Sequence, residues 1–183
     1  MMEGVIKILA LEDRLADFEL SKRQVVRNLP NVLFTRAANE EEFHTKLRQG
    51  TYDLILADYH LPAYNGLTAL LYVKEHFPRL PFIFVTGALN SEEAAATAIL
   101  DGANGYVLKE NINKLHLHIQ KVLRDAAESA NLHKAQIARE NAHRMKIQKA
   151  AALLNRSEEF KGKAEVLELI NSLLPKNQLQ QAG

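Results

Sequence analysis

The stretch that decides the fold is residues 54–66, which reads LILADYHLPAYNG. Its first four residues, Leu54–Ala57, are all apolar, which is typical of a short strand covered on both faces of a sheet. Asp58 ends the apolar run, and the Pro and Gly residues that follow indicate a loop. A carboxylate therefore lies at the carboxyl end of a buried strand, where open parallel sheets bind their ligands.

Further apolar runs before and after this stretch predict the rest of the sheet. The runs alternate with segments of helical spacing, a pattern typical of a parallel sheet with helices on both faces. We therefore expect an α/β, doubly wound parallel sheet rather than an antiparallel one. The five predicted strands are Val5–Ala10, Val32–Arg36, Leu54–Ala57, Phe82–Val85 and Gly105–Leu108.

Helix signals lie between the predicted strands. Asn39 and Glu42 form an N-cap pair, and Gly50 ends the helix that they begin. Ser91, followed by Glu92 and Glu93, opens an alanine-rich helix that Gly102 can close. Apolar spacing predicts the buried faces of the other helices, which are Leu15, Phe18, Val25 and Leu29 in the first, Phe43 and Leu47 in the second, and Leu67, Leu70, Leu71 and Phe77 in the third.

The chain changes character from Asn111 onward, because strand signals stop and no proline occurs before Pro175. This composition predicts a long helix from Ile112 to about Leu154. The expected domains are a globular domain of residues 1–125 and a helical extension or linker of residues 126–183, with coiled-coil character. After a turn near Gly162, the amphipathic segment Val166–Leu174 either folds back or pairs with a partner.

The long helix also carries a weak dimer signal. Residues at alternating spacings of three and four predict a homodimer through the helix after Leu115, although small and polar residues weaken the seam. The residues of this predicted seam are Ile119, Leu123, Ala126, Ala130, His133 and Ile137.

Composition excludes several classes of function. The chain has no cysteine, so it has no disulfide, thiolate metal site or cysteine nucleophile. The first apolar run, Val5–Leu11, contains Lys7 and meets an acid at once, unlike a signal peptide, and no later run could span a membrane. We therefore expect a cytoplasmic protein. A formal net charge of +1 and a tail without interleaved aromatic residues argue against nucleic acid as a partner.

Polar residues follow four of the five predicted strands. Glu12 and Asp13 follow the first, Asp58 the third, Thr86 the fourth and Lys109 the fifth. Three carboxylates and one ammonium group leave two negative charges in excess, which repel one another unless a divalent cation neutralises them. Hard oxygen ligands without His or Cys point to Mg²⁺. Asp58 is then a carboxylate nucleophile for phosphoryl transfer, while Lys109 and the Thr86 hydroxyl hold phosphoryl oxygens.

Four motifs stand in order along the chain, namely Glu12-Asp13, the run from Asp58 to Gly66, Val85-Thr86-Gly87, and the run from Gly102 to Lys109. Through these motifs the sequence resembles the receiver domain of two-component response regulators over roughly its first 110 to 125 residues.

The resemblance implies a flavodoxin-like sheet of strand order 2-1-3-4-5 and Mg²⁺-dependent transfer of a phosphoryl group to Asp58. The donor would be a histidine kinase or a histidine phosphotransfer protein, and the chain would catalyse only its own phosphorylation and dephosphorylation. The family's metal residues match Glu12, Asp13, Asp58 and the backbone carbonyl of His60. Thr86 and Tyr106 match its switch pair, which reshapes the face of helix four, strand five and helix five.

Two departures from the family pattern concern the site. Glu110 follows Lys109 where the family often has a proline after a cis bond, so we expect either a trans bond with a locally shifted Lys109 or a strained cis bond. His60 lies two residues after the acceptor, where it either shields the phosphoryl group from water or is a surface loop histidine.

Two alternative functions compete with this interpretation. A haloacid-dehalogenase-type phosphatase also uses an Asp nucleophile, but that class requires an acid where His60 stands. A nucleic-acid-binding regulator acting through the tail predicts salt-dependent binding of RNA or DNA.

Overall fold

The computed structural model describes residues 4–62, 64–87, 97–158 and 161–173. The chain divides into two compact units, Met1–Glu128 and Ser129–Gly183. The first unit contains the sheet, and the second is helical.

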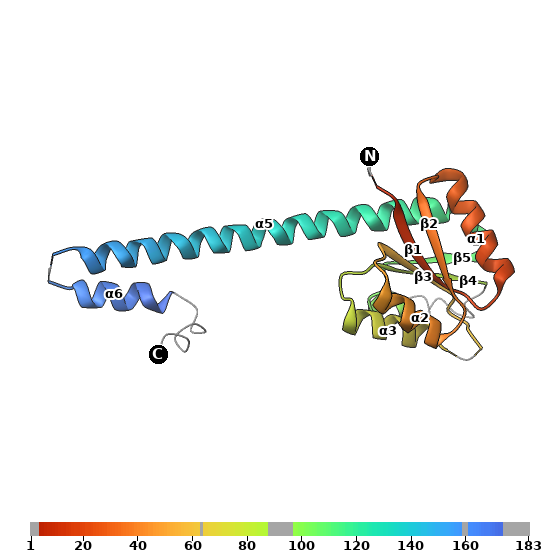
Figure 1. Cartoon of the computed structure of the whole chain (residues 1–183), viewed down its shortest axis with the longest axis horizontal. Helices are drawn as coiled ribbons and strands as arrows, with labels where there is room; N and C mark the ends of the chain where they lie inside the picture. Colours follow the sequence, from red (N-terminus) through yellow and green to blue (C-terminus); the bar gives the residue numbers. More distant parts are fainter. Residues whose placement is uncertain (1–3, 63, 88–96, 159–160, 174–183) are drawn as a thin grey trace. The chain divides into compact units, whose positions relative to one another are not determined.

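The first unit is built on a five-stranded parallel sheet (Figure 1). The strand order is β2-β1-β3-β4-β5, which confirms the predicted flavodoxin-like, doubly wound topology. The observed strands begin or end within one residue of the predicted ones. They are β1 (Ile6–Leu11), β2 (Val32–Ala37), β3 (Leu54–Ala57), β4 (Phe82–Thr86) and β5 (Gly105–Leu108).

Helices connect the strands and extend the chain beyond the sheet. Residues 97–100 are also helical and precede β5. The other helical elements are α1 (Leu15–Asn28), α2 (Glu40–Gln49), α3 (Gly66–His76), the 3₁₀ helix η1 (Lys109–Lys114), α5 (Leu115–Arg156) and α6 (Lys163–Ser172).

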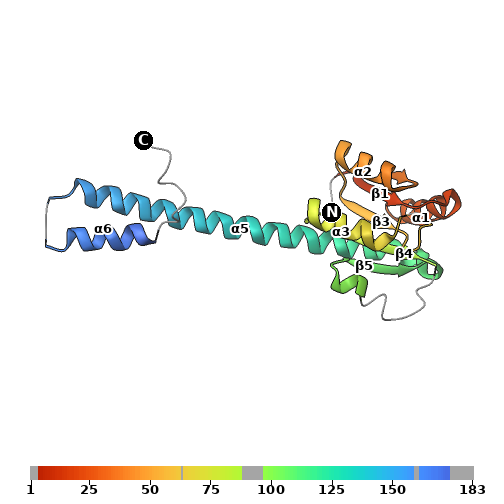
Figure 2. The same cartoon turned by 90° about the horizontal axis from the view of Figure 1, so that it is seen from below.

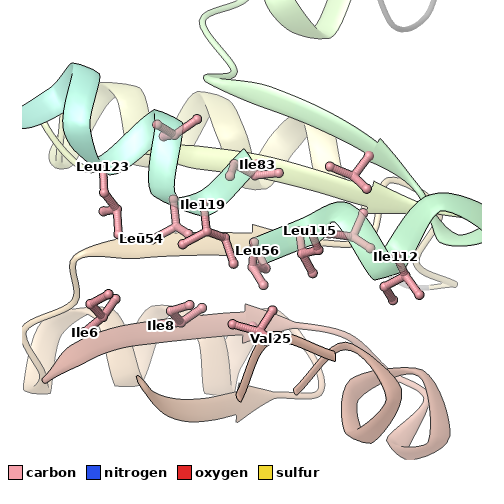
Figure 3. Packing of buried hydrophobic residues seen from close by; sticks show 14 of the residues in the cluster. Ile6, Ile8, Val25, Leu54, Leu56, Ile83, Ile112, Leu115, Ile119 and Leu123 are labelled. Carbon is pink, nitrogen blue, oxygen red and sulfur yellow. The ribbon is translucent and has the colours of Figure 1, made fainter. Parts of the chain in front are cut away.

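Each face of the sheet carries its own apolar core. Strand β1 shows the alternation, because Ile8 belongs to one core and Leu9 to the other. The first core joins the sheet to α1 and to the beginning of α5, where Leu115 and Ile119 are fully buried (Figure 3). The second core lies under α2 and α3. Both faces of the central strands are thus covered, which explains why Leu54–Ala57 is apolar throughout.

Helix α2 is bounded by the residues that its sequence predicts. The Asn39 side chain accepts a hydrogen bond from the Glu42 backbone N–H at 2.9 Å. Glu42 in turn accepts from the backbone N–H of Ala38 at 3.3 Å, one residue before the cap. The helix ends at Gln49, with Gly50 as its C-cap.

Two predictions of buried residues were wrong. Leu15 is 58% exposed at the first position of α1, and Leu71 is 52% exposed on α3. The buried side of α3 instead contains the smaller residues Ala69 and Val73, beside Leu70.

The proposed beginning of the fourth helix at Ser91 lies outside the described residues. Its predicted end does not, because Gly102 has a φ of 99°, a left-handed conformation that favours glycine. The chain then turns directly into β5.

The predicted long helix exists, but part of its predicted dimer seam is buried. Helix α5 begins three residues later than expected, after η1. Ile119 and Leu123 are 0% and 6% exposed because they pack against the sheet. Both residues are therefore buried within the first unit, and their assignment to a dimer seam was wrong.

The second unit is a helical hairpin. Gly162 has a φ of 90° and is the last residue before α6, which folds back alongside the end of α5 (Figures 1 and 2). The Lys163 ammonium group donates to the backbone oxygen of Ser157 at 2.9 Å and holds this turn. Several apolar side chains of the hairpin are exposed, namely Leu132, Ile137, Met145, Leu153, Val166, Leu169 and Leu173.

The helices in the described part of the chain are too short or too polar to cross a membrane. None of them combines the length and the apolar character that a transmembrane span requires.

Candidate functional site

The carboxyl edge of the sheet gathers the polar residues that the sequence predicted. Strand pairing sets Leu11 beside Ala57, so the residues that follow them, Glu12 and Asp58, are neighbours. The Asp58 backbone N–H donates to the carbonyl of Leu11 at 3.0 Å, which fixes this register. Thr86 ends β4 opposite Leu108 of β5, so Lys109 lies one residue further along, at the same edge.

Lys109 is the centre of this cluster. Its ammonium nitrogen lies 2.7 Å from Asp58 Oδ2, 3.0 Å from Glu12 Oε2 and 2.7 Å from Asp17 Oδ2. The Glu12 and Asp58 side chains are only 8% and 9% exposed, whereas Lys109 and Asp17 are 17% and 20% exposed. Three carboxylates thus converge on one ammonium group, and two negative charges remain in excess.

Burial and the ammonium group have opposite effects on these carboxylates. Burial raises the pKa of Glu12, even though hydrogen bonds from Lys109 and from the Arg14 backbone N–H act in the other direction. The hydrogen bond from Lys109 lowers the pKa of the less buried Asp17. Burial disfavours the charge on Lys109, but its hydrogen bonds to Asp17, Asp58 and Glu12 together raise its pKa. Lys109 is therefore an ammonium ion at neutral pH.

Asp13 is held through its backbone. The Arg36 guanidinium, at the end of β2, donates from Nε to the carbonyl oxygen of Glu12 at 2.9 Å and from Nη2 to the carbonyl oxygen of Asp13. This clamp fixes the turn that follows β1. A cavity of about 170 Å³ adjoins the turn and is lined by Asp13, Ala38, Asn39, Leu61, Pro62 and Tyr64.

The residues directly after Asp58 are held by its carboxylate. The His60 backbone N–H donates to Asp58 Oδ1 at 3.1 Å. The His60 side chain is exposed, and its ring packs edge-on against Tyr59 at 5.1 Å between centroids. The structure therefore places His60 on the surface of the loop, where the sequence left open a shield or a surface histidine.

Gly66 allows helix α3 to begin close to Asp58. A Cβ atom at Gly66 would collide with the backbone oxygen of Asp58 and lie 2.9 Å from Cα of Tyr59. The Asn65 side chain caps the same helix by accepting from the Leu67 N–H at 2.9 Å. The absence of a side chain at residue 66 thus sets the distance between α3 and the backbone of Asp58 and Tyr59.

The predicted switch residues lie on β4 and β5, which are the two strands on the same side of β3. Thr86 is fully buried, and its hydroxyl oxygen has no hydrogen-bond partner among the residues that the structure describes. Tyr106 is half-buried and packs against the core under α2 and α3, with its hydroxyl oxygen buried. A buried hydroxyl without a partner is costly, and the Thr86 hydroxyl is placed to bond a ligand oxygen at this edge of the sheet.

The bond between Lys109 and Glu110 is trans, which is one of the two outcomes that the sequence left open. Lys109 is the first residue of η1, and its side chain still reaches Asp58 from there.

The donor set suits a hard divalent cation. Glu12, Asp13 and Asp58 offer carboxylate oxygens, and the excess negative charge on two buried carboxylates favours Mg²⁺ chemically. In the described residues, no group of three or more His, Cys, Asp and Glu side chains is arranged to hold a metal ion. The Glu12 and Asp58 oxygens instead close on the Lys109 ammonium group.

Two residues of this cluster were missed by the sequence analysis. Asp17 lies in the first turn of α1, where an acid is ordinary because it stabilises the helix dipole. Arg36 is the penultimate residue of β2 and resembles any surface arginine in the sequence. Neither residue forms a motif, and only the folded sheet brings them to the acidic turn.

The fold and this acidic edge define a class of signalling domains, and comparison with known proteins identifies the family. The family model described as "Response regulator receiver domain" matches residues 8–120. The chain therefore belongs to the response regulator receiver domain family. It is a phosphoacceptor of two-component signalling rather than a conventional enzyme, and a receiver domain implies a cognate histidine kinase.

Individual relatives agree with this assignment. The transcriptional regulatory protein KdpE of Staphylococcus aureus is 31% identical over 121 residues, which cover 66% of this chain and 51% of KdpE. The chain thus spans about half the length of that relative. A CheY-like receiver domain from Methanospirillum hungatei aligns with a TM-score of 0.61 and 24% identity, over 69% of this chain and 99% of the other.

A further solved structure bears on the metal. The response regulator TrrA of Thermotoga maritima, in complex with Mg²⁺ and beryllofluoride, aligns with a TM-score of 0.55 and 24% identity, over 64% of this chain and 98% of TrrA. At this identity the similarity shows the fold, and the metal belongs to TrrA.

Proposed function

We propose that Asp58 is the phosphoacceptor of this receiver domain and that its donor is a phosphohistidine on a histidine kinase or a histidine phosphotransfer protein. The observation that carries the proposal is the 2.7 Å contact between the Lys109 ammonium group and the Asp58 carboxylate at the carboxyl edge of β3. This contact brings the nucleophile and a cationic hydrogen-bond donor to one point.

The proposed reaction transfers one phosphoryl group between two side chains. A carboxylate oxygen of Asp58 forms a bond to phosphorus while the bond between phosphorus and the donor imidazole nitrogen breaks. The imidazole leaves with the electron pair of that bond and takes up a proton, and Asp58 becomes an acyl phosphate.

Residues around Asp58 prepare it for this reaction. Lys109 donates to a phosphoryl oxygen, because its ammonium group already lies beside the carboxylate. The buried Thr86 hydroxyl donates to a second phosphoryl oxygen. Mg²⁺, when bound by Glu12, Asp13, Asp58 and the backbone carbonyl of His60, would neutralise the carboxylates and the transferred group.

The proposed output begins at Thr86 and Tyr106. Thr86 ends β4 beside Leu108 of β5, and Tyr106 lies on β5 beside Phe84 of β4. Movement of the Thr86 hydroxyl toward a phosphoryl group would leave space beside β5, and Tyr106 would turn further inward. This change would reshape the face of the fourth helix, β5 and α5 and shift a two-state equilibrium.

We further propose a cytoplasmic location, where receiver domains typically act.

We also propose a homodimer formed by the helical hairpin. Ala130, His133 and Ile137 are exposed, lie at spacings of three and four on one face of α5, and support the dimer. Static light scattering tests it: the chain should have twice its monomer mass, and a variant with Ala130→Glu and Ile137→Glu should be monomeric. Equal masses for the two proteins would contradict the dimer.

The central experiment for the proposed function measures intact mass. Incubation with acetyl phosphate and Mg²⁺ should add the mass of one phosphoryl group to the wild-type chain, and chelation of the metal should prevent it. The variant Asp58→Asn should stay unmodified. A modification that survives in Asp58→Asn, or an unchanged wild-type mass, would contradict the proposal.

A further inference from the structure

Asp17 contacts Lys109 as closely as the acceptor aspartate does. The Asp17 and Asp58 carboxylates each lie 2.7 Å from the ammonium nitrogen, and Glu12 lies 3.0 Å from it. An ammonium group has three N–H donors, so these three carboxylates use all of them. A phosphoryl oxygen can gain Lys109 only by displacing one of the three.

The three carboxylates differ in what happens to them when the site is loaded. Glu12 and Asp58 belong to the donor set proposed for Mg²⁺, so their charges would be offset by the cation. Asp17 belongs to helix α1 and is not in that set, so it would retain its charge and its attraction for Lys109. Asp17 is therefore the lasting competitor of a phosphoryl oxygen for the ammonium group.

We propose that Asp17 is a positioning residue that holds Lys109 in the resting state and competes with the phosphoryl group for it. This inference rests on the proposed function, since it assumes that a phosphoryl group is carried on Asp58. Asp17 thereby weakens the affinity of the site for a phosphoryl group and sets how readily the phosphorylated state forms.

The surroundings of Asp17 limit the size of the effect. Its second cationic neighbour, Arg14, is 3.5 Å away and 70% exposed, so it replaces only part of what Lys109 provides. Asp17 is itself 20% exposed, and water can solvate it after Lys109 leaves. A charge-assisted hydrogen bond under such screening supports a change in phosphoryl affinity of about three- to tenfold.

The test measures binding of beryllofluoride, a phosphoryl mimic, to the full chain at saturating Mg²⁺ by titration calorimetry. The variant Asp17→Asn keeps the shape of the side chain but loses its charge, and it should bind beryllofluoride about three- to tenfold more tightly than wild type. The variant Asp17→Glu restores a carboxylate and should return toward the wild-type affinity. Mg²⁺ affinity without beryllofluoride should change less than twofold in Asp17→Asn, which separates control of Lys109 from a general change of the site.

A matched control removes the same charge from the same helix. Glu19 lies two residues further along α1 and pairs with Lys22 at 3.6 Å rather than with Lys109. Glu19→Gln should therefore bind beryllofluoride with wild-type affinity. An increase in affinity equal to that of Asp17→Asn would show that the effect comes from net charge alone, and it would overturn the inference.

The outcomes separate the inference from the proposed function. If wild type binds beryllofluoride with Mg²⁺ and Asp58→Asn does not, the proposed function stands, and an affinity for Asp17→Asn equal to or weaker than wild type overturns the competition alone. If wild type does not bind beryllofluoride at all, both proposals fail.

Discussion

Replacing Gly66 with alanine adds one methyl group where the beginning of helix α3 passes the backbone of Asp58 and Tyr59. The added Cβ would overlap the Asp58 carbonyl oxygen and lie 2.9 Å from Cα of Tyr59 and 3.0 Å from the Phe84 ring. Two of these three neighbours are backbone atoms, which cannot move away by a change of rotamer. Either the beginning of α3 or the backbone of Asp58 and Tyr59 must therefore move to make room for the methyl group.

The size of the effect follows from two opposing contributions. Overpacking of a well-packed interior costs about 1–3 kcal/mol, and collision with the backbone places this substitution near the upper end. Alanine is a better helix former than glycine by up to about 1 kcal/mol, and this gain offsets part of the cost. We expect Gly66→Ala to lower the free energy of unfolding by about 2 kcal/mol.

Urea denaturation followed by near-UV circular dichroism of the tyrosines measures this loss, because the signal reports packing within the receiver domain. Gly87→Ala is the matched control, since a Cβ at Gly87 would have no atom of the described residues within 4 Å. The control should unfold within about 0.5 kcal/mol of wild type. Equal stability of Gly66→Ala and Gly87→Ala would refute the close approach of α3 to Asp58.

Three further predictions concern the scaffold. Asn39→Ala removes the N-cap of α2 and should cost about 1 kcal/mol in urea denaturation, and a loss below a few tenths would contradict the cap. Ile119→Ala should lower the free energy of unfolding by about 2–5 kcal/mol because the side chain is fully buried. Leu132 is 73% exposed, so Leu132→Ala should stay within about 0.5 kcal/mol of wild type. Similar losses in the two variants would contradict the packing of α5 on the sheet. Burial lowers the pKa of His44 from 6.5, so the folded state binds its proton less readily than the unfolded state. This difference leaves stability unaffected above about pH 6.5 and lowers it as the pH falls below that value. The variant His44→Gln, at the residue that contacts Tyr64, should therefore lose less stability than wild type between about pH 7.5 and about pH 5.5. Equal losses would contradict the lowered pKa of His44.

The sheet could be predicted from sequence because its strands are buried on both faces. A run such as Leu54–Ala57 has no polar position, and the chain alternates such runs with capped helices. The cap of α2 was predictable because Asn39 stands three residues before Glu42, the spacing at which a side-chain oxygen accepts a hydrogen bond from the backbone N–H at the beginning of a helix. The family resemblance supplied the strand order.

The errors arose where helical spacing alone had to select the buried side. Leu71 has the spacing of a core residue, but α3 turns Ala69 and Val73 toward the sheet and leaves Leu71 half exposed. Ile119 and Leu123 fit a dimer seam and a receiver core equally well in the sequence, and the sheet buries them. Spacing shows that one face is apolar without showing what covers it.

The candidate site divides in the same way. Glu12, Asp58, Thr86 and Lys109 were predictable because each follows or ends an apolar strand at the same edge. Asp17 was not, because an acid in the first turn of a helix has an ordinary explanation. Its contact with Lys109 joins residues 92 positions apart in the chain and arises only when β5 lies on the same sheet as β1.

The location of the phosphoryl group is the most direct test of the central claim. After incubation with acetyl phosphate and Mg²⁺, borohydride reduces an aspartyl phosphate to homoserine, and peptide mass spectrometry then identifies the modified residue. The account predicts homoserine at residue 58 and at no other aspartate, with none formed in Asp58→Asn. Homoserine at Asp13 or Asp17, or a phosphoryl group retained on a histidine with Asp58 unchanged, would contradict it.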